Sequence, residues 1–421
     1  MLGLLLVAAT VEIVLDGASG KSALIPPQPH ITGWLSGLGE LLGFRVFLIA
    51  LLVSTCAYAG LVLLSLRAGA GVVRTRAIIG LVAVLQGLVF IGPILLSTDV
   101  FSYIAYARMG VLHGINPYLH GPIAIRHDAI FPYVGKDWLK AATAYGPLYT
   151  LLSYPLALVG VVGAVWGMKL IALLASAGTM LLTWRCAKVR ELDPASALLI
   201  VGANPLFVLY GLGGAHNDLL MMLVMMGAVS VMLGTQLSAR REGVSAALIV
   251  AGGLIKATVA VLLPFMIVSR RRLAPVLGAL AALAGIALIA YLAFGTQGLD
   301  VVSALNRDSA FVSTDSFATE IAHTLGKPGV FPIDHDLLKA GLVLIVLHLL
   351  WRTWRGYDWI AASGWALLAI SVTATWLLAW YILWPLPLAV VVRDRRLLVA
   401  TLTVQGLFIL HQLSPLLLPV R

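Results

Sequence analysis

Long apolar runs separated by short basic clusters are the feature that most constrains how this chain can fold. Of its 421 residues, 61% are hydrophobic and 11% are charged, whereas soluble domains have roughly 45–50% apolar and about 25% charged residues. A membrane-spanning helix needs about 20 apolar residues, so the chain can supply about 11–13 of them. We therefore predict an all-α, polytopic integral membrane protein in the lipid bilayer, with one transmembrane domain over residues 1–421.

The excess of basic over acidic residues reflects the predicted membrane topology. The chain has 28 Lys and Arg against 18 Asp and Glu, a net charge of +10. Many of the cations lie in short loops between apolar runs, which is typical of the cytoplasmic side of a membrane protein. We therefore predict no nucleic-acid partner. The clusters are Arg67, Arg74 and Arg76; Arg185, Lys188 and Arg190; Arg240 and Arg241; Arg270, Arg271 and Arg272; Arg352 and Arg355; and Arg393, Arg395 and Arg396.

The alternation of basic and polar loops predicts the topology. Residues 2–15 lack the basic start and cleavage pattern of a signal peptide, so we expect a short first helix. A span over 46–66 leads to a basic, cytoplasmic loop, and a single crossing over 78–96 leads outward. The segment 97–144 therefore faces the outside. A second long outer segment is predicted over 295–336.

The other apolar runs complete the predicted helices. Residues 145–184 lead from the outer segment to the basic loop at Arg185, so they must cross the membrane an odd number of times. Only two helical stretches are visible, so this prediction allows one of them to be re-entrant. Residues 243–268 carry arginines at both ends, which favours a hairpin of two short helices hinged between Gly252 and Lys256. Single helices are predicted over 195–212, 219–233, 273–294, 337–350, 361–375, 376–392 and 397–417.

Asp99 is the candidate catalytic residue. It lies where a membrane helix meets the first outer segment, and Tyr103 and Tyr106 share one face of a short interfacial helix that Gly114 would end. A partly desolvated carboxylate at this boundary has a raised proton affinity, which suits a general base. The alternative is that Asp99 caps the helix that begins at Val100.

A polar triplet and an isolated lysine are candidate ligand-binding groups. His216, Asn217 and Asp218 follow two glycines at an outer helix start. The glycines would let a ligand approach the backbone, and the three side chains can hold sugar hydroxyls or cap the next helix. Lys256 lies in a strongly apolar segment, where a lysine is costly unless it is paired or faces a cavity. We predict that it binds phosphate, with snorkelling to the interface as the alternative. Arg307 and His323 lie in the second outer segment and are further candidates for phosphate binding. The alternative is that both belong to a solvated loop.

Aromatic motifs have two interpretations. Tyr381 and Trp384 can form part of an aromatic belt at the membrane interface, or can stack on sugar rings. Tyr145 belongs to a Tyr-Gly-Pro sequence, and Asn116 and Tyr118 belong to an Asn-Pro-Tyr sequence. Both sequences are most typical of turns.

Motifs for metals and nucleotides are absent from the sequence. The two cysteines, Cys56 and Cys186, lie within or at the end of apolar runs, and the nine histidines form no metal-binding pattern. There is no P-loop, dinucleotide fingerprint or nucleophile elbow. Phe101 occupies the position where a D-x-D pair with Asp99 would need an acid. We therefore expect no metal and no cofactor.

Taken in order, these pieces resemble the actinobacterial polyprenol-phosphate-mannose-dependent α-1,6-mannosyltransferases of the GT-C superfamily, which build the mannan core of lipomannan and lipoarabinomannan. The resemblance spans about residues 97–387. The motifs that carry it are Asp99-Val-Phe-Ser-Tyr103, Gly114-Ile-Asn116-Pro117-Tyr118, Tyr145-Gly-Pro-Leu148, Asn204-Pro-Leu206, Gly213-Gly-Ala-His216-Asn217-Asp218, Lys256 and Trp380-Tyr-Ile-Leu-Trp384-Pro385.

This resemblance implies a GT-C fold in the plasma membrane and an inverting sugar transfer on its extracytoplasmic face. The donor would be a polyprenyl-phosphate-linked sugar, mannose in the family, and the acceptor a glycan or glycolipid hydroxyl. Asp99 would be the general base, and the two outer segments would cover the active site. Lys256, Arg307 and His323 would stabilise the departing phosphate. The sugars would be oriented by Tyr103, Asn116, Tyr118, Tyr145, His216, Asn217, Asp218, Tyr381 and Trp384.

Two alternatives remain open. One is a GT-C enzyme that uses another polyprenyl-phosphate sugar. The other is a polytopic lipid or solute transporter or flippase, which the number of apolar runs permits. Transporters usually place their polar residues near the bilayer midplane in two corresponding halves. Here the polar residues gather at outer helix ends and in the two outer segments, which favours an enzyme that works at one face.

Overall fold

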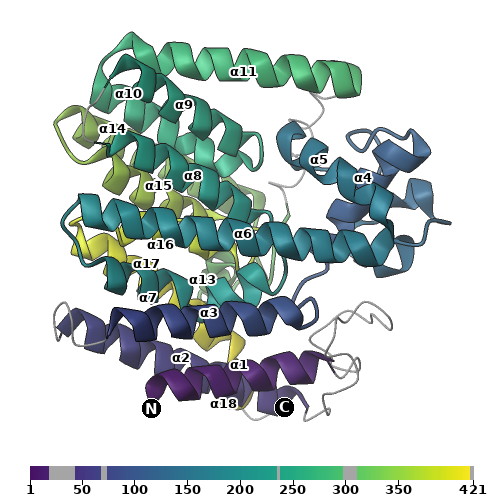
Figure 1. Cartoon of the computed structure of the whole chain (residues 1–421), viewed down its shortest axis with the longest axis horizontal. Helices are drawn as coiled ribbons and strands as arrows, with labels where there is room; N and C mark the ends of the chain where they lie inside the picture. Colours follow the sequence, from purple (N-terminus) through teal and green to yellow (C-terminus); the bar gives the residue numbers. More distant parts are fainter. Residues whose placement is uncertain (19–42, 68–73, 235–237, 297–310, 418–421) are drawn as a thin grey trace.

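The computed structural model describes residues 1–18, 43–67, 74–234, 238–296 and 311–417. Within these ranges the chain forms 17 α-helices, with short 3-10 and π turns and no strand, which confirms the predicted all-α fold. Figure 1 shows α1, α3, α6 and α11 running in roughly the same direction, with α11 at the top, α1 at the bottom, and α4 and α5 at the right. Most of the predicted loop 17–44, and Arg307, lie outside the described residues.

The first three helices lie where the sequence predicted them. They are α1 (Leu2–Ala18), α2 (Phe44–Arg67) and α3 (Thr75–Ile91), and α1 packs on both others. The third ends five residues earlier than the apolar run does. Pro93 explains this end, because proline disfavours a helical residue before it and has no N–H to donate.

A unit of short helices follows, at the right of Figure 1. It consists of α4 (Asp99–His113) and three 3-10 turns, Pro122–Ile125, Phe131–Tyr133 and Lys136–Trp138. As predicted, α4 ends at Gly114, whose φ of 62° is a left-handed conformation that glycine adopts readily. Asp128 ties the unit together, because it accepts hydrogen bonds from Arg108 at 2.8 and 3.0 Å and lies 2.7 Å from His113.

Prolines break the apolar runs that follow. The run after Tyr145 forms α5 (Pro147–Ser153), a 3-10 turn at Tyr154–Val159 and the long α6 (Gly160–Val189). The predicted 195–212 helix is instead α7 (Pro194–Gly202) and a π-helical turn, η5 (Leu206–Leu212), which are bent by 51° relative to each other. At this break Asn204 accepts hydrogen bonds from Leu206 N and Phe207 N.

The predicted break before Lys256 is confirmed. Here α9 (Ala239–Gly253) and α10 (Leu262–Arg270) are separated by an irregular stretch and the 3-10 turn Ala257–Val261. Next, α11 (Leu273–Phe294) packs along α9, where Gly278 and Gly243 meet. A Cβ atom on Gly278 would lie 2.2 Å from the Gly243 carbonyl oxygen. This contact is the reason for a glycine at that position.

The C-terminal third contains one wrong prediction. The helices not yet named, up to residue 373, are α8 (Asp218–Met232), α13 (Phe317–Thr324), α14 (Pro332–Trp354) and α15 (Trp359–Thr373). The expected helix over 376–392 is instead a 3-10 turn, Tyr381–Leu383, and the four-residue α16 (Leu386–Ala389). Pro385 and Pro387 prevent a continuous helix. The chain then forms α17 (Arg395–Gln412) and α18 (Ser414–Leu417).

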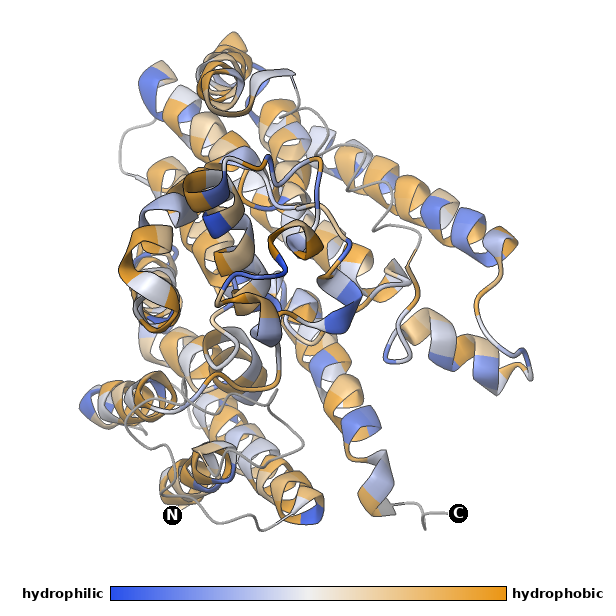
Figure 2. Cartoon of the chain, turned by 90° about the vertical axis from the view of Figure 1, so that its right-hand side faces the viewer, coloured by the Kyte–Doolittle hydropathy of each residue, from blue (hydrophilic) through white to orange (hydrophobic). Residues whose placement is uncertain are grey.

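The described helices are those of a membrane protein. Three are long and apolar enough to cross a membrane: Phe44–Arg67, the continuous stretch Pro147–Val189, and Leu273–Phe294. The bent α7–η5 pair would be a fourth span, and four more apolar helices have 10–17 residues. Fewer helices than the expected 11–13 therefore qualify by length, since breaks shorten the others. Figure 2 shows hydrophobic residues along most helices and hydrophilic ones mainly at helix ends and in connections.

Candidate functional site

A cavity of about 330 Å³ lies where α4, the break after α9, α14 and the chain after α15 meet. Asp99 is the one carboxylate among the described residues that line it. The other lining residues are mostly apolar or aromatic: Ser102, Tyr106, Trp138, Ala142, Ala144, Tyr145, Lys256, Ala257, Thr258, His335, Leu338, Lys339, Leu342, Ile370, Thr373, Ala374, Thr375, Trp376, Leu378, Tyr381 and Trp384.

Asp99 lies in the first turn of α4, and its side chain is 9% exposed. Thr98, and not Asp99, occupies the capping position, so the carboxylate is not used as a helix cap. Burial raises the pKa of Asp99 to about 7, although the nearby Lys256 charge and a hydrogen bond from Trp138 oppose the rise. A carboxylate with this pKa can accept and release a proton near neutral pH.

His216 is packed beside the carboxylate. Its Nδ1 lies 3.7 Å from Asp99 Oδ2 and 3.4 Å from the Tyr103 hydroxyl, and its ring stacks on Trp380 at 3.5 Å between centroids. Tyr103 OH also lies 3.4 Å from Asn217 Oδ1. Burial, with a contribution from Lys256, lowers the pKa of His216 well below its usual value. The imidazole is therefore neutral at pH 7 and does not ion-pair with Asp99.

The two glycines before this triplet have a packing role. A Cβ atom on Gly214 would lie 2.4 Å from His216 Nε2, and one on Gly213 would lie 2.1 Å from the Leu209 carbonyl oxygen. The sequence suggested that these glycines let a ligand approach the backbone. In the structure they let the His216 ring fold back onto its own turn.

Asp218 and Lys256 form a buried ion pair. Asp218 is fully buried, and Lys256 Nζ donates to its two carboxylate oxygens at 2.7 and 2.9 Å. Trp384 Nε1 donates to the same carboxylate at 2.6 Å. The ammonium lies 4.3 Å from the ring centre of Tyr381, which stacks on Trp384 at 4.5 Å. The positive charge of Lys256 is thus largely compensated within the protein.

Backbone contacts hold the stretch that precedes Lys256 against the start of α5. Gly146 N donates to the Ile255 carbonyl at 3.3 Å, and Leu148 N to the Leu254 carbonyl at 3.2 Å. A Cβ atom on Gly146 would lie 1.9 Å from the Leu254 carbonyl oxygen. Only glycine permits this approach, which explains the Tyr-Gly-Pro sequence beside the cavity. Tyr145 itself lines the cavity and contacts Tyr103 edge to face.

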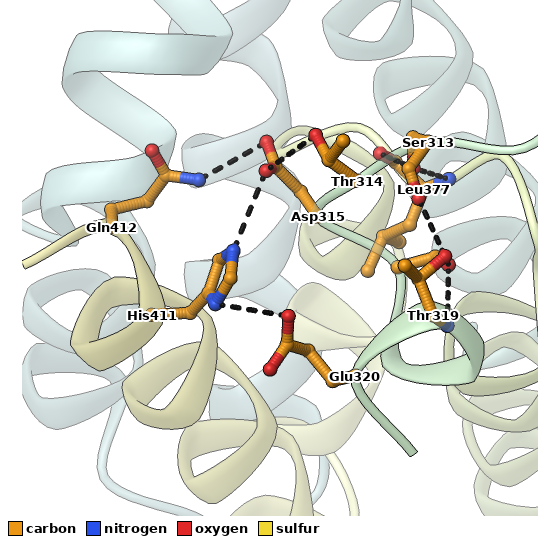
Figure 3. Close-up of polar contacts among 9 residues, drawn as sticks. Ser313, Thr314, Asp315, Thr319, Glu320, Leu377, His411 and Gln412 are labelled. Carbon is orange, nitrogen blue, oxygen red and sulfur yellow. Dashed lines mark hydrogen bonds and ion pairs between the residues drawn. The ribbon is translucent and has the colours of Figure 1, made fainter. Parts of the chain in front are cut away.

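The chain after α15 forms one wall of the cavity and is hydrogen-bonded to Ser313 (Figure 3). Ser313 N donates to the Thr375 carbonyl at 2.8 Å, and the Ser313 hydroxyl bonds to both backbone groups of Leu377 at 3.0 Å. Farther along, His411 of α17 lies 3.5 Å from both Asp315 and Glu320. These contacts fix the segment that carries Trp376 and Leu378 into the cavity lining.

Several predicted site residues lie elsewhere. Asn116 donates to the Phe294 carbonyl at 3.3 Å and Tyr118 to the Tyr145 carbonyl at 3.0 Å, so both join the short-helix unit to its neighbours. Neither is among the lining residues. His323 is an exposed residue of α13 that does not line the cavity. Arg307 lies outside the described residues.

Trp138, Trp376, His335 and Lys339 are four of the lining residues that the sequence did not single out. Trp138 hydrogen-bonds to Asp99 and meets Trp376 edge to face at 6.1 Å between ring centres. His335 and Lys339 lie one turn apart on α14. Their spacing of four residues places them on one face of a helix. The helix was expected to start at residue 337, which excluded His335, but it starts at Pro332. Within the described ranges, no three His, Cys, Asp or Glu side chains converge as metal ligands.

The chain is similar to known proteins over most of its length. Residues 2–272 match the family described as Alpha-(1->6)-mannopyranosyltransferase, N-terminal domain, and residues 143–419 match Glycosyltransferase family 87. Alpha-(1->6)-mannopyranosyltransferase A of Mycobacterium tuberculosis is 28% identical over 347 residues, 75% of this chain and 66% of that protein. The protein of the same name from Corynebacterium glutamicum is 31% identical over 191 residues, 44% of this chain and 37% of that protein. The chain thus spans less than two thirds of either relative.

Proposed function

This chain belongs to the Alpha-(1->6)-mannopyranosyltransferase family and to Glycosyltransferase family 87, and from that premise we propose that it transfers mannose from a polyprenyl-phosphate-linked donor to an acceptor hydroxyl. The acceptor is a glycan or glycolipid at the extracytoplasmic face, and the product is an α-1,6-mannoside. The family membership confirms the resemblance that the ordered motifs predicted. Donor, acceptor and membrane face are the parts that we propose.

The observation that carries the proposal is the position of Asp99. It is the one carboxylate that lines the cavity in the described part of the chain, and its pKa is raised to about 7. The acceptor hydroxyl gives its proton to Asp99 while its oxygen bonds to the anomeric carbon. The bond from that carbon to the phosphate oxygen breaks, and its electron pair remains on the phosphate. Attack opposite the phosphate inverts the anomeric centre, so a β-linked donor gives an α-mannoside.

The aromatic residues of the cavity suit a sugar. Tyr145, Tyr381 and Trp384 present aromatic rings that can stack on the apolar faces of sugars. The first outer segment, 97–144, supplies Asp99 and Trp138, in keeping with our proposal that it covers the active site. Lys256 orders the Tyr381–Trp384 pair through cation–π contacts.

The pH dependence of transfer follows from Asp99. A general base acts in its deprotonated form, and the pKa of Asp99 is about 7. We therefore expect kcat/KM to rise with pH to a plateau, with a midpoint at about pH 7, and to fall about tenfold for each unit below it. Initial rates between pH 5 and 9 test this. A profile that is flat down to pH 5.5 would contradict the role of Asp99.

Trp138→Phe should move this midpoint upward. The substitution keeps an aromatic ring but removes the indole N–H, whose hydrogen bond lowers the pKa of Asp99. A hydrogen bond to a charged group contributes about 1.5–3 kcal/mol, which corresponds to a shift of about one to two units. Trp376→Phe is the matched control, since Trp376 is not among the groups that shift this pKa. Equal midpoints in the two variants would show that Trp138 does not tune the base.

A further inference from the structure

The inner part of the cavity has little spare positive charge for a phosphate. Lys256, the lysine expected to bind it, already donates to both oxygens of Asp218 at 2.7 and 2.9 Å. Asp99 adds a second acid nearby. An anionic ligand placed here would have to compete with Asp218 for the same ammonium group, at the cost of a buried unpaired carboxylate.

A second pair of basic residues lies on α14. His335 and Lys339 are four residues apart, so they share one face of the helix, and both line the cavity. Thr375 Oγ1 lies 3.4 Å from His335 Nδ1 and orients the ring. Among the described residues, Lys339 makes no ion pair. Of the two acids nearest to it in sequence, Asp334 is bound to Lys327 at 2.9 Å and Asp336 does not line the cavity.

The surroundings of this pair indicate what kind of anion would bind. Leu338 and Leu342 flank Lys339 on α14, and Ile370 and Leu378 add to the same cavity lining. A cation beside an apolar wall suits an amphiphile with an anionic head and a hydrocarbon tail. Lysine binds a phosphate as a point charge, and the histidine N–H adds a directional donor.

We propose that Lys339 and His335 form the binding site for a lipid-linked phosphate, with Lys339 supplying the charge and His335 a hydrogen bond. This inference rests on the proposed function, since the phosphate would be that of the sugar donor and of the lipid product. It assigns to α14 the role that the sequence suggested for Lys256, Arg307 and His323. Lys256 instead keeps Asp218, Tyr381 and Trp384 in place.

Direct binding to the purified full chain in detergent tests the site without catalysis. The probe is radiolabelled farnesyl phosphate, with farnesol and inorganic phosphate as competitors. We expect Lys339→Met to weaken farnesyl phosphate binding about 10- to 100-fold and Lys339→Arg to stay within about threefold of wild type. Lys327→Met is the matched control, because this nearby lysine pairs with Asp334 and does not line the cavity. It should bind like wild type.

The competitors separate the sources of the phosphate. Weak competition by both farnesol and inorganic phosphate supports a lipid phosphate. Strong competition by inorganic phosphate alone would overturn the lipid assignment. Equal binding by wild type and Lys339→Met, or no binding by wild type, would overturn the site.

A transfer assay keeps this inference distinct from the proposed function. If wild type transfers mannose and Lys339→Met has an unchanged KM for the donor, the function stands and the α14 site is wrong. If farnesyl phosphate binding depends on Lys339 but no sugar is transferred from any polyprenyl-phosphate donor, the site stands and the function is wrong.

Discussion

Asp99→Asn should lower kcat/KM for mannosyl transfer by about 10²- to 10⁴-fold, the usual contribution of a general base. Asparagine has nearly the same shape but cannot take up the proton of the acceptor hydroxyl. The fold should persist, because Thr98 holds the capping position of α4 and the Asp99 carboxylate makes no strong ion pair. Initial rates with polyprenyl-phosphate mannose and a short α-mannoside acceptor measure the effect.

Asp137→Asn is the matched control for this substitution. Asp137 lies on the 3-10 turn beside Trp138, is exposed, and does not line the cavity. Its variant should retain wild-type activity. An Asp99→Asn protein that melts like wild type and transfers at the wild-type rate would remove Asp99 from the catalytic role.

Lys256→Met should destabilise the protein strongly as well as inactivate it. The substitution leaves the fully buried Asp218 carboxylate with Trp384 but without its cation. Removing one partner of a buried ion pair typically costs about 3–5 kcal/mol, because the other charge remains desolvated. We expect a clear drop in the melting temperature in detergent, together with loss of transfer.

The double variant Asp218→Asn/Lys256→Met separates stability from function. It removes both charges, so it should recover much of the lost stability, since neutral replacements of buried pairs are often tolerated. Activity should stay low, because the ordering of Tyr381 and Trp384 is not restored. Arg393→Gln, which breaks the exposed pair with Glu191, should change stability by less than about 1 kcal/mol. A Lys256→Met variant as stable as Arg393→Gln would contradict a structural ion pair.

Local signals predicted the features that depend on one segment. The helix that begins at Asp99 ends at Gly114 because the last position needs a left-handed conformation. The break before Lys256 was predicted from arginines at both ends of one apolar run. In both places the physical cause lies within the segment itself, so the sequence alone was sufficient.

The features that were missed depend on contacts between distant segments. Nothing local to Trp138 indicates that it hydrogen-bonds to Asp99, and nothing local to Asp218 indicates that its partner is Lys256, 38 residues later. The apolar run 376–392 was read as a membrane helix because its composition is that of a span. Its prolines break it into turns, and burial by neighbouring helices replaces contact with lipid.

The most direct test is transfer by the purified chain from polyprenyl-phosphate mannose, followed by determination of the product linkage by NMR. We predict an α-1,6-mannoside that forms from a β-linked donor, with activity that requires Asp99. A panel of other polyprenyl-phosphate sugars and GDP-mannose is assayed in parallel. A β-linked product, or transfer only from the nucleotide sugar, would contradict inversion by Asp99 with a lipid-linked donor.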